Sequence, residues 1–363
     1  MIASSRGVRR SLGATLLLAG IGVLELGCAI EGTDAATGAG GGSSCARATL
    51  PPPPTIESGP STEDTWLAWR VVRFDAAMDG GPLGLDLDGR CTCQGEAPAC
   101  LPPEGAEPVC DLLEGRDNAA GDFAAKAALR LGIPSLGELF TQAAQTGNAT
   151  LLVRLTGYDG AQSDDQVTVR VYGSAGFGGA VPTFTQNDAW PIDASYLEAP
   201  ADDVEKARYR DDAAYVTEGQ LVAFIPELPV IARNLNMRSA FPLSGALLTG
   251  KLVPDGGGYR LERGLLAARV GQAAALGAIG ELCDFNGLPV CTNDADYAAL
   301  KSTVCERRDL FLSSGGPTKP CDALSFALAF EAEPAGAAAT PSPAPPPGTS
   351  CDAMSLPAND ACD

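Results

Sequence analysis

The sequence predicts an α+β domain with an antiparallel, β-rich core that is sandwich or jelly-roll-like, with two helical blocks. Runs rich in β-branched and aromatic residues outnumber the helical patterns, and turns rich in glycine or aspartate join many of them. The helical patterns are grouped and do not alternate with the strands, which argues against a parallel doubly wound sheet. Twelve cysteines in a chain with an export signal indicate that disulfides stabilise this fold.

The expected strands are short runs of apolar, β-branched or aromatic residues, and they lie at 66–75, 150–156, 166–172, 214–217, 220–225, 243–253, 259–262 and 323–331. Turn residues at 157–165 join two of them into a hairpin, and a glycine-rich turn at 255–258 joins another pair. The last strand closes the domain.

The two helical blocks follow different parts of this strand order. Helices are expected at 119–131, 134–146, 264–283 and 294–308. Asn118 precedes the first of them and is a residue type that caps helices well.

Residues 1–27 have the order of a secretory signal peptide. Three arginines precede an apolar run at 12–24, and a small residue follows it. The run is shorter than the roughly 20 apolar residues that a membrane-spanning helix needs. We therefore expect export without a transmembrane anchor, because Glu25 ends the apolar run.

Gly27-Cys28 resembles the cleavage site of bacterial lipoproteins, with Glu25 at a position where that family prefers leucine. The resemblance implies that Cys28 becomes the mature N-terminus and carries a diacylglycerol and palmitate, which attach the protein to the membrane. Ala29, where aspartate would favour the inner membrane, implies the outer membrane by the same resemblance. The alternative is an ordinary signal peptide that is cut nearby, with Cys28 a plain thiol or removed.

Composition divides the exported chain into three parts. Residues 28–60 are rich in Gly, Ser, Ala and Thr and include four consecutive prolines, which is typical of a tether. Residues 61–333 are long enough to bury a core and are expected to form a single globular domain. Residues 334–363 are expected to form an Ala/Pro-rich tail with a small C-terminal cysteine loop.

The cysteines fall into groups within which we expect disulfides, namely Cys91, Cys93, Cys100 and Cys110, then Cys283, Cys291, Cys305 and Cys321, and finally Cys351 and Cys362. Each group of four allows three pairings, and spacing alone does not choose among them. Cys45 is left over in the tether. A four-cysteine metal site is the alternative, which the oxidising compartment and the absence of paired C-x₂-C spacing in the first group disfavour.

The formal net charge of −20 and the absence of histidine exclude several classes of function. An acidic surface repels nucleic acid, so no nucleic-acid partner is expected. Without histidine, neither a Ser-His-Asp nor a Cys-His nucleophile system nor a histidine-ligated zinc site is available. We assign no catalytic residue and no required cofactor. Chemistry that needs only carboxylates, as in glycosidases, remains open.

Asp86, Asp88, Asp117 and Asn118 are the candidate metal ligands, and calcium is the candidate ion. The segment Asp-Leu-Asp-Gly places two carboxylates on one side of a turn, and calcium binds six to eight hard oxygens in such loops. Disulfides in the first cysteine group are expected to bring the other two residues close. The alternative is turn chemistry together with a helix cap, for which aspartate and asparagine are equally suited.

Several short segments in one order resemble a group of exported lipoproteins of Gram-negative bacteria, namely GLDLDG at 84–89, GRDNA at 115–119, DAWP at 188–191 and CDALS at 321–325 leading to FEA at 330–332. In that group an isoleucine takes the place of Arg116, and a glycine that of Ala323. The resemblance covers most of 61–333. It implies export, and it implies no activity, because the group has no assigned function.

The expected function is that of a non-catalytic, lipid-anchored cell-envelope protein that is structural or binds a surface ligand, with calcium shaping one loop. Its expected partners are the membrane, through the N-terminal lipid, and a surface glycan or an envelope protein. Trp190 is a candidate for stacking on a sugar ring, with a place in the core as the alternative. The alternative function is a carboxylate-dependent polysaccharide hydrolase, which needs two carboxylates about 5–10 Å apart in a cleft.

Overall fold

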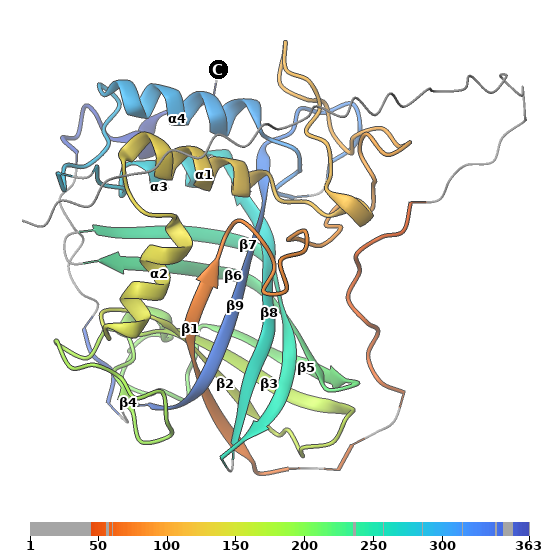
Figure 1. The fold of residues 1–363 in the computed structure, drawn as a ribbon, viewed down its shortest axis with the longest axis vertical. Helices are drawn as coiled ribbons and strands as arrows, with labels where there is room; N and C mark the ends of the chain where they lie inside the picture. The colour runs from red at the N-terminus through yellow and green to blue at the C-terminus, as the bar shows by residue number, and fades with distance from the viewer. Residues whose placement is uncertain are drawn as a thin grey trace, which may run out of the picture. The chain divides into compact units, whose positions relative to one another are not determined.

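Eight strands of the described chain form one antiparallel sheet that closes on itself (Figure 1). Neighbouring strands follow the order β1-β2-β3-β5-β6-β7-β8-β9, and β1 pairs with both β2 and β9. The short strand β4 adds to β9 in parallel. The strands are β1 (Asp64–Arg73), β2 (Leu151–Thr156), β3 (Asp164–Gly173), β4 (Ala189–Trp190), β5 (Tyr209–Thr217), β6 (Gln220–Asn234), β7 (Met237–Asp255), β8 (Gly258–Gly271) and β9 (Ala323–Ala337).

The computed structural model describes residues 45–55, 58–59, 61–234, 237–256, 258–284, 286–313, 315–337, 340–343 and 351–362, all within one compact unit. The expected signal peptide at 1–27 and lipid attachment at Cys28 lie outside the described residues and stay predictions. Within those residues, no helix combines the length and the apolar character that crossing a membrane requires.

The α+β class with an antiparallel, β-rich core is confirmed. The core is a closed barrel, where a sandwich or jelly-roll-like arrangement was expected from sequence. Hairpin signals are the same in both architectures, because each reports only on strands that follow one another. The pairing of β1 with β9 distinguishes them, since it joins the first and last long strands and closes the sheet into a barrel.

The two helices of the first block are confirmed. α1 (Ala119–Leu131) begins after Asn118, whose Oδ1 accepts the backbone N–H of Gly121 at 3.2 Å. α2 (Leu136–Gln145) begins with a capping box, in which Ser135 and Glu138 each accept a backbone N–H from the other. α2 contacts both β1 and β6, which are not neighbours in the sheet, so this helix bridges two separate parts of the barrel (Figure 1).

The second helical block is shorter than expected. It consists of α3 (Gln272–Ile279) and α4 (Ala295–Glu306), and short 3₁₀ helices lie at Leu113–Gly115, Ala194–Tyr196 and Pro357–Asn359. The helix predicted from Gly264 is wrong as far as Gly271, because β8 continues to that residue between β7 and β9. Pairing along both edges of β8 outweighs the helix propensity of its alanines and leucines.

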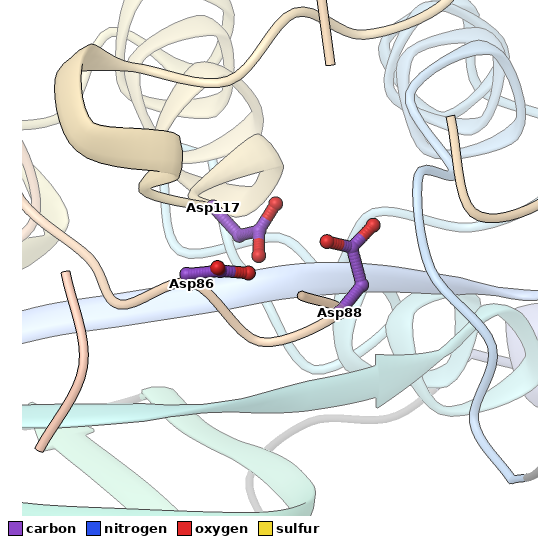
Figure 2. A group of neighbouring side chains, drawn as sticks. All are labelled: Asp86, Asp88 and Asp117. Atoms are coloured by element: carbon purple, nitrogen blue, oxygen red, sulfur yellow. The ribbon is translucent and has the colours of Figure 1, made fainter. Parts of the chain in front are cut away.

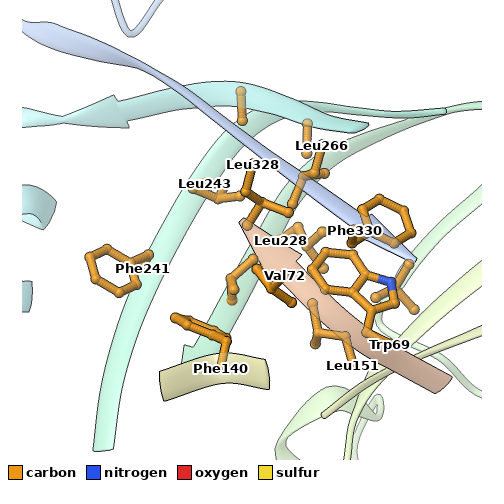
Figure 3. Close-up of a cluster of buried hydrophobic side chains, with 14 of the residues drawn as sticks. Trp69, Val72, Phe140, Leu151, Leu228, Phe241, Leu243, Leu266, Leu328 and Phe330 are labelled. Carbon is orange, nitrogen blue, oxygen red and sulfur yellow. The ribbon is translucent and has the colours of Figure 1, made fainter. Parts of the chain in front are cut away.

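β9 alternates large side chains with small ones, and all eight are buried, namely Leu324, Phe326, Leu328 and Phe330 on one face and Ala323, Ser325, Ala327 and Ala329 on the other. The large face enters the main core, where Phe330 stacks on Trp69 with ring centroids 4.0 Å apart (Figure 3). On the small face, Ala327 and Ala329 pack against Leu83 of the loop before α1. Small side chains on this face allow the loop to lie directly on the strand.

Five disulfides cross-link the described residues, namely Cys45–Cys91, Cys93–Cys110, Cys100–Cys321, Cys291–Cys351 and Cys305–Cys362. Pairing within the expected groups holds for Cys93–Cys110 alone among these five. The other groupings are wrong because the fold brings distant segments together, as where Leu101 and Pro320 form a β-bridge beside Cys100–Cys321. Cys45 is paired and not left over, and Cys283 is buried and belongs to none of the five pairs.

The C-terminal segment 351–362 is fastened to the rest of the fold. Cys351 and Cys362 do not form the expected small loop, because each pairs with a cysteine near α4. Asp360 also accepts hydrogen bonds from Tyr297 Oη at 2.7 Å and Lys301 Nζ at 2.9 Å. Together with Cys45–Cys91, these disulfides cross the boundaries expected for a domain at 61–333, so residues outside that range contribute to its stability.

Candidate metal centre

Two loop segments approach each other before α1 begins. Asp117 donates its backbone N–H to the Leu85 carbonyl oxygen at 3.0 Å, within an antiparallel bridge. Gly84 permits this approach, because its φ is +135° and a Cβ there would lie 2.5 Å from the Asp117 carbonyl oxygen. The second segment is fixed on β9, since Ala119 donates its N–H to Ser325 Oγ at 2.7 Å.

Asp86, Asp88 and Asp117 meet where these segments touch (Figure 2). Each offers one carboxylate oxygen, and the three oxygens lie within 4.8 Å of one another. Each carboxylate also accepts one backbone N–H, at 2.6, 2.8 and 2.6 Å, from Gly89, Arg90 and Leu87 respectively. These hydrogen bonds orient the carboxylates without neutralising their charge.

Asn118 was also predicted as a ligand, but its side-chain oxygen accepts two backbone N–H groups elsewhere. Its Oδ1 accepts the N–H of Gly121 at 3.2 Å and that of Ala327 on β9 at 3.1 Å. The side chain therefore caps α1 and fastens the helix to the strand, and we remove it from the candidate ligands. Its predicted role as a helix cap is confirmed.

Two further carboxylates lie close to the cluster, and sequence reasoning missed both. Asp111 is hydrogen-bonded to Asp117 and accepts the Thr92 N–H at 2.6 Å. Asp309 accepts the N–H and the hydroxyl of Ser325, at 2.7 and 2.5 Å. Long-range contacts bring them here, so no local spacing predicts their proximity. The one sequence signal is that Asp111 directly follows a cysteine.

Burial and mutual repulsion raise the pKa of these carboxyl groups. The pKa of Asp117 rises to about 9, first through burial and then through the negative charges of Asp309 and Asp88. Burial is also the largest cause that raises the pKa of Asp111 to about 6, and it raises the pKa of Asp88. Near neutral pH the metal-free cluster therefore retains protons, which a bound cation would displace.

The arginines around the cluster neutralise it only in part. Arg47 Nε lies 3.6 Å from Asp86 Oδ2, but Arg47 also binds Glu96 at 2.9 Å. Arg269 donates to the backbone carbonyl oxygen of Leu87. The Asp86 side chain is only 2% exposed, so water compensates its charge poorly. A divalent cation would stabilise such a group of buried carboxylates.

The donor atoms of the cluster are oxygens, which suit a hard cation. Calcium binds carboxylates, backbone carbonyls and water at about 2.3–2.6 Å and tolerates irregular geometry. The twelve-residue EF-hand pattern is absent from the sequence, so this would be a site assembled from separate segments. Transition metals that prefer imidazole find no such ligand in this chain.

Two open pockets, of about 460 and 510 Å³, are lined by other residues. The smaller one lies beside Cys291–Cys351 and is lined by four aspartates, of which Asp296 pairs with Arg130 at 3.1 Å. Hydrogen bonds, first that from the Leu288 N–H, lower the pKa of Asp284, another of the four. A glycosidase requires a general acid with a raised pKa, so Asp284 does not fit that role.

Trp190 is fully buried and cannot stack on a sugar ring. Its indole packs against Phe177, with ring centroids 4.4 Å apart, and against Phe184 at 6.0 Å. The interpretation of Trp190 as a core residue is confirmed, and that of a sugar contact is wrong.

The comparisons with known proteins give no family for this chain. Comparison with protein-family models, with curated proteins and with solved structures finds no match. Function is therefore inferred from the chemistry of the cluster, from the disulfides and from the pattern of the N-terminal residues.

Proposed function

We propose that this chain is an exported, lipid-anchored cell-envelope protein without catalytic activity, and that its Asp86, Asp88 and Asp117 cluster binds calcium. The observation that carries the calcium proposal is the convergence of three carboxylate oxygens within 4.8 Å of one another. Asp111 and Asp309 add negative charge beside them. Bound calcium would hold the loop from Gly84 to Asp117 against β9 and shape a surface for a glycan or an envelope protein.

The charge balance of the site supports this role. Two ionised carboxylates about 5 Å apart repel each other by about 3 kcal/mol at an effective dielectric constant near 20. The three carboxylates form three such pairs when all are ionised, and the neighbouring arginines compensate them only in part. A divalent cation turns this repulsion into attraction, so binding and folding of the loop would stabilise each other.

Thermal unfolding of the exported chain, with calcium and with a chelator, tests the proposal. At a hundredfold excess of calcium over its Kd, binding stabilises the folded state by about 2.7 kcal/mol, which raises Tm by several degrees. In Asp88→Asn the amide oxygen can still accept the Arg90 N–H, but the negative charge is lost. We expect this variant to lose the calcium shift and to be at least as stable as the parent in chelator, since one repulsive charge is gone.

The matched control for this experiment is Asp79→Asn. Asp79 also accepts a backbone N–H within a glycine turn, from Gly81 at 3.1 Å, but it is exposed and outside the cluster. It should keep the full calcium shift. If the parent shows no shift, or if Asp88→Asn keeps it, calcium binding at this cluster is contradicted, and turn chemistry with a helix cap accounts for these aspartates.

The export and anchoring part of the proposal has separate support. Five disulfides fit an oxidising compartment outside the cytosol. Cys28→Ala removes the thiol that would carry the lipid, so this variant should move from the membrane fraction to the soluble fraction of an expressing Gram-negative cell. Unchanged partitioning of Cys28→Ala would contradict the lipid anchor and leave the calcium proposal intact.

A further inference from the structure

The disulfide Cys93–Cys110 differs from the other four in its accessibility. Both of its cysteines are exposed, whereas each of the other disulfides within the described ranges has at most partly exposed cysteines. Attack by a thiolate on a disulfide requires access to sulfur. A soluble reductant should therefore open this bond before the others.

Cys93–Cys110 also holds one of the carboxylates beside the cluster. Asp111 directly follows Cys110, and it accepts the N–H of Thr92, the residue before Cys93, at 2.6 Å. On the other side of Cys93, Gln94 Nε2 donates to the Asp111 carbonyl oxygen at 3.2 Å. Asp111 is in turn hydrogen-bonded to Asp117. The disulfide thus lies within a short chain of contacts that ends at a candidate metal ligand.

The loop that this disulfide closes has almost no buried side chains of its own. Between Cys93 and Cys110 the structure assigns no helix and no named strand, and Cys100 is the one buried residue in that stretch. Cys100 is joined by a disulfide to Cys321, which lies two residues before β9. With so few buried apolar side chains, the cross-link and the hydrogen bonds of Thr92 and Gln94 to Asp111 hold the loop ends together.

We propose that Cys93–Cys110 is a redox switch for the calcium site. Reduction of this disulfide would release Asp111 from beside Asp117 and so weaken calcium binding. This inference rests on the proposed function. The reductant is a dithiol, which supplies two electrons and two protons. Its thiolate attacks one sulfur and forms a mixed disulfide, its second thiol then displaces the protein sulfur, and the products are two cysteine thiols and an oxidised cyclic disulfide.

The test has two stages and uses the exported full chain. Limited treatment with dithiothreitol, trapping with iodoacetamide and peptide mapping first show which disulfide opens; we expect label on Cys93 and Cys110 before any other cysteine. Calorimetric titration with calcium chloride then compares the oxidised chain with the Cys93→Ser/Cys110→Ser variant. We expect Kd to rise at least tenfold in the variant.

The matched control is Cys291→Ser/Cys351→Ser, which removes a disulfide of the C-terminal segment and should leave the calcium Kd unchanged. Unfolding curves in chelator establish that each variant is folded. If the oxidised parent binds no calcium, both the proposed calcium site and the redox switch are contradicted. If the parent binds calcium but the Cys93→Ser/Cys110→Ser variant binds it equally well, or if another disulfide opens first, the redox switch is contradicted and the calcium site is not.

Discussion

Gly84 determines whether the two loop segments of the cluster can meet. Its φ of +135° is a region that residues with a Cβ rarely adopt, and its Cα lies against the Asp117 carbonyl. Gly84→Ala should therefore destabilise the protein by about 2–3 kcal/mol, from backbone strain and from the displaced bridge, and should abolish calcium binding. Chemical denaturation and calcium titration measure the two effects.

Gly80→Ala is the control for backbone strain alone. Gly80 has φ of +81°, but a Cβ there meets no atom within 4 Å. Gly80→Ala should lower the free energy of unfolding by about 1 kcal/mol and leave calcium affinity unchanged. Equal effects of the two substitutions would show that the close approach at Asp117 does not matter.

Asp309 predicts a pH dependence of the metal-free protein. Burial raises its folded-state pKa from 3.8 to about 7, although Ser325 donates two hydrogen bonds to it. The folded state therefore binds the proton more tightly than the unfolded state, and this stabilisation is present below about pH 4 and lost as the pH rises through about 7. Asp309 should contribute about 2 kcal/mol to the fall in stability from pH 5 to pH 7, measured by urea denaturation in chelator as the difference between the parent and Asp309→Asn.

Asp309→Asn provides the control, because it removes the titrating proton. Its stability should vary less between pH 5 and pH 7 than that of the parent. A parent whose stability stays constant or rises over this interval in chelator would contradict the raised pKa of Asp309.

Local spacing predicts part of the cluster. Asp86 and Asp88 stand two residues apart before Gly89, and their convergence follows from that turn. Asp117 adjoins a predictable helix cap. Local spacing does not predict Asp111 and Asp309, because tertiary contacts position them. The disulfide Cys93–Cys110 holds Asp111, and Ser325 on β9 holds Asp309, which follows α4.

Among the elements, β9 packs against the main core with one face and against the loop before α1 with the other. Ala327 on the small face packs against Leu83, whereas Leu328 on the large face lies in the main core (Figure 3). Ala327→Leu should displace the loop that carries Asp86 and so lower calcium affinity. It should also lower the free energy of unfolding by about 1–3 kcal/mol through overpacking. Leu328→Ala should lower the free energy of unfolding by about 2–5 kcal/mol and leave calcium affinity nearly unchanged.

Denaturation curves and calcium titrations of both variants separate the two faces. Loss of calcium affinity in Leu328→Ala, with affinity retained in Ala327→Leu, would reverse the assignment of the faces.

Most elements are predictable because their local signals agree with the fold. Asn118 and Ser135 cap α1 and α2 as their residue types suggest, and β2 and β3 follow their hairpin pattern. The last part of β8 is not predictable, because Leu265 to Val270 have helical propensity and become a strand only between two partner strands. Tertiary pairing decides their conformation.

At the scale of the whole molecule, Cys100–Cys321 is the longest cross-link among the described disulfides, with a separation of 221 residues. Non-reducing peptide mapping should find a peptide pair that joins these two cysteines. Replacing both with alanine should destabilise the protein by about 4–5 kcal/mol, the largest effect among the five pairs, since the longest loop is released. A map that joins Cys100 to Cys91, Cys93 or Cys110 would contradict this connectivity.

The closure of the barrel and the disulfide pattern share one reason for being unpredictable from sequence. Both depend on contacts between segments that are far apart in the chain, as in β1 with β9 and Cys100 with Cys321. Strand patterns and cysteine spacing report only on neighbouring segments. The overall class follows from such local patterns, and the architecture does not.

An anomalous difference map from crystals of the exported chain grown with calcium shows whether the ion binds between these carboxylates. We expect a peak about 2.3–2.6 Å from carboxylate oxygens of Asp86, Asp88 and Asp117. The peak should disappear in crystals of Asp88→Asn. Carboxyl groups hydrogen-bonded to one another at millimolar calcium, with no peak between them, would contradict the claim.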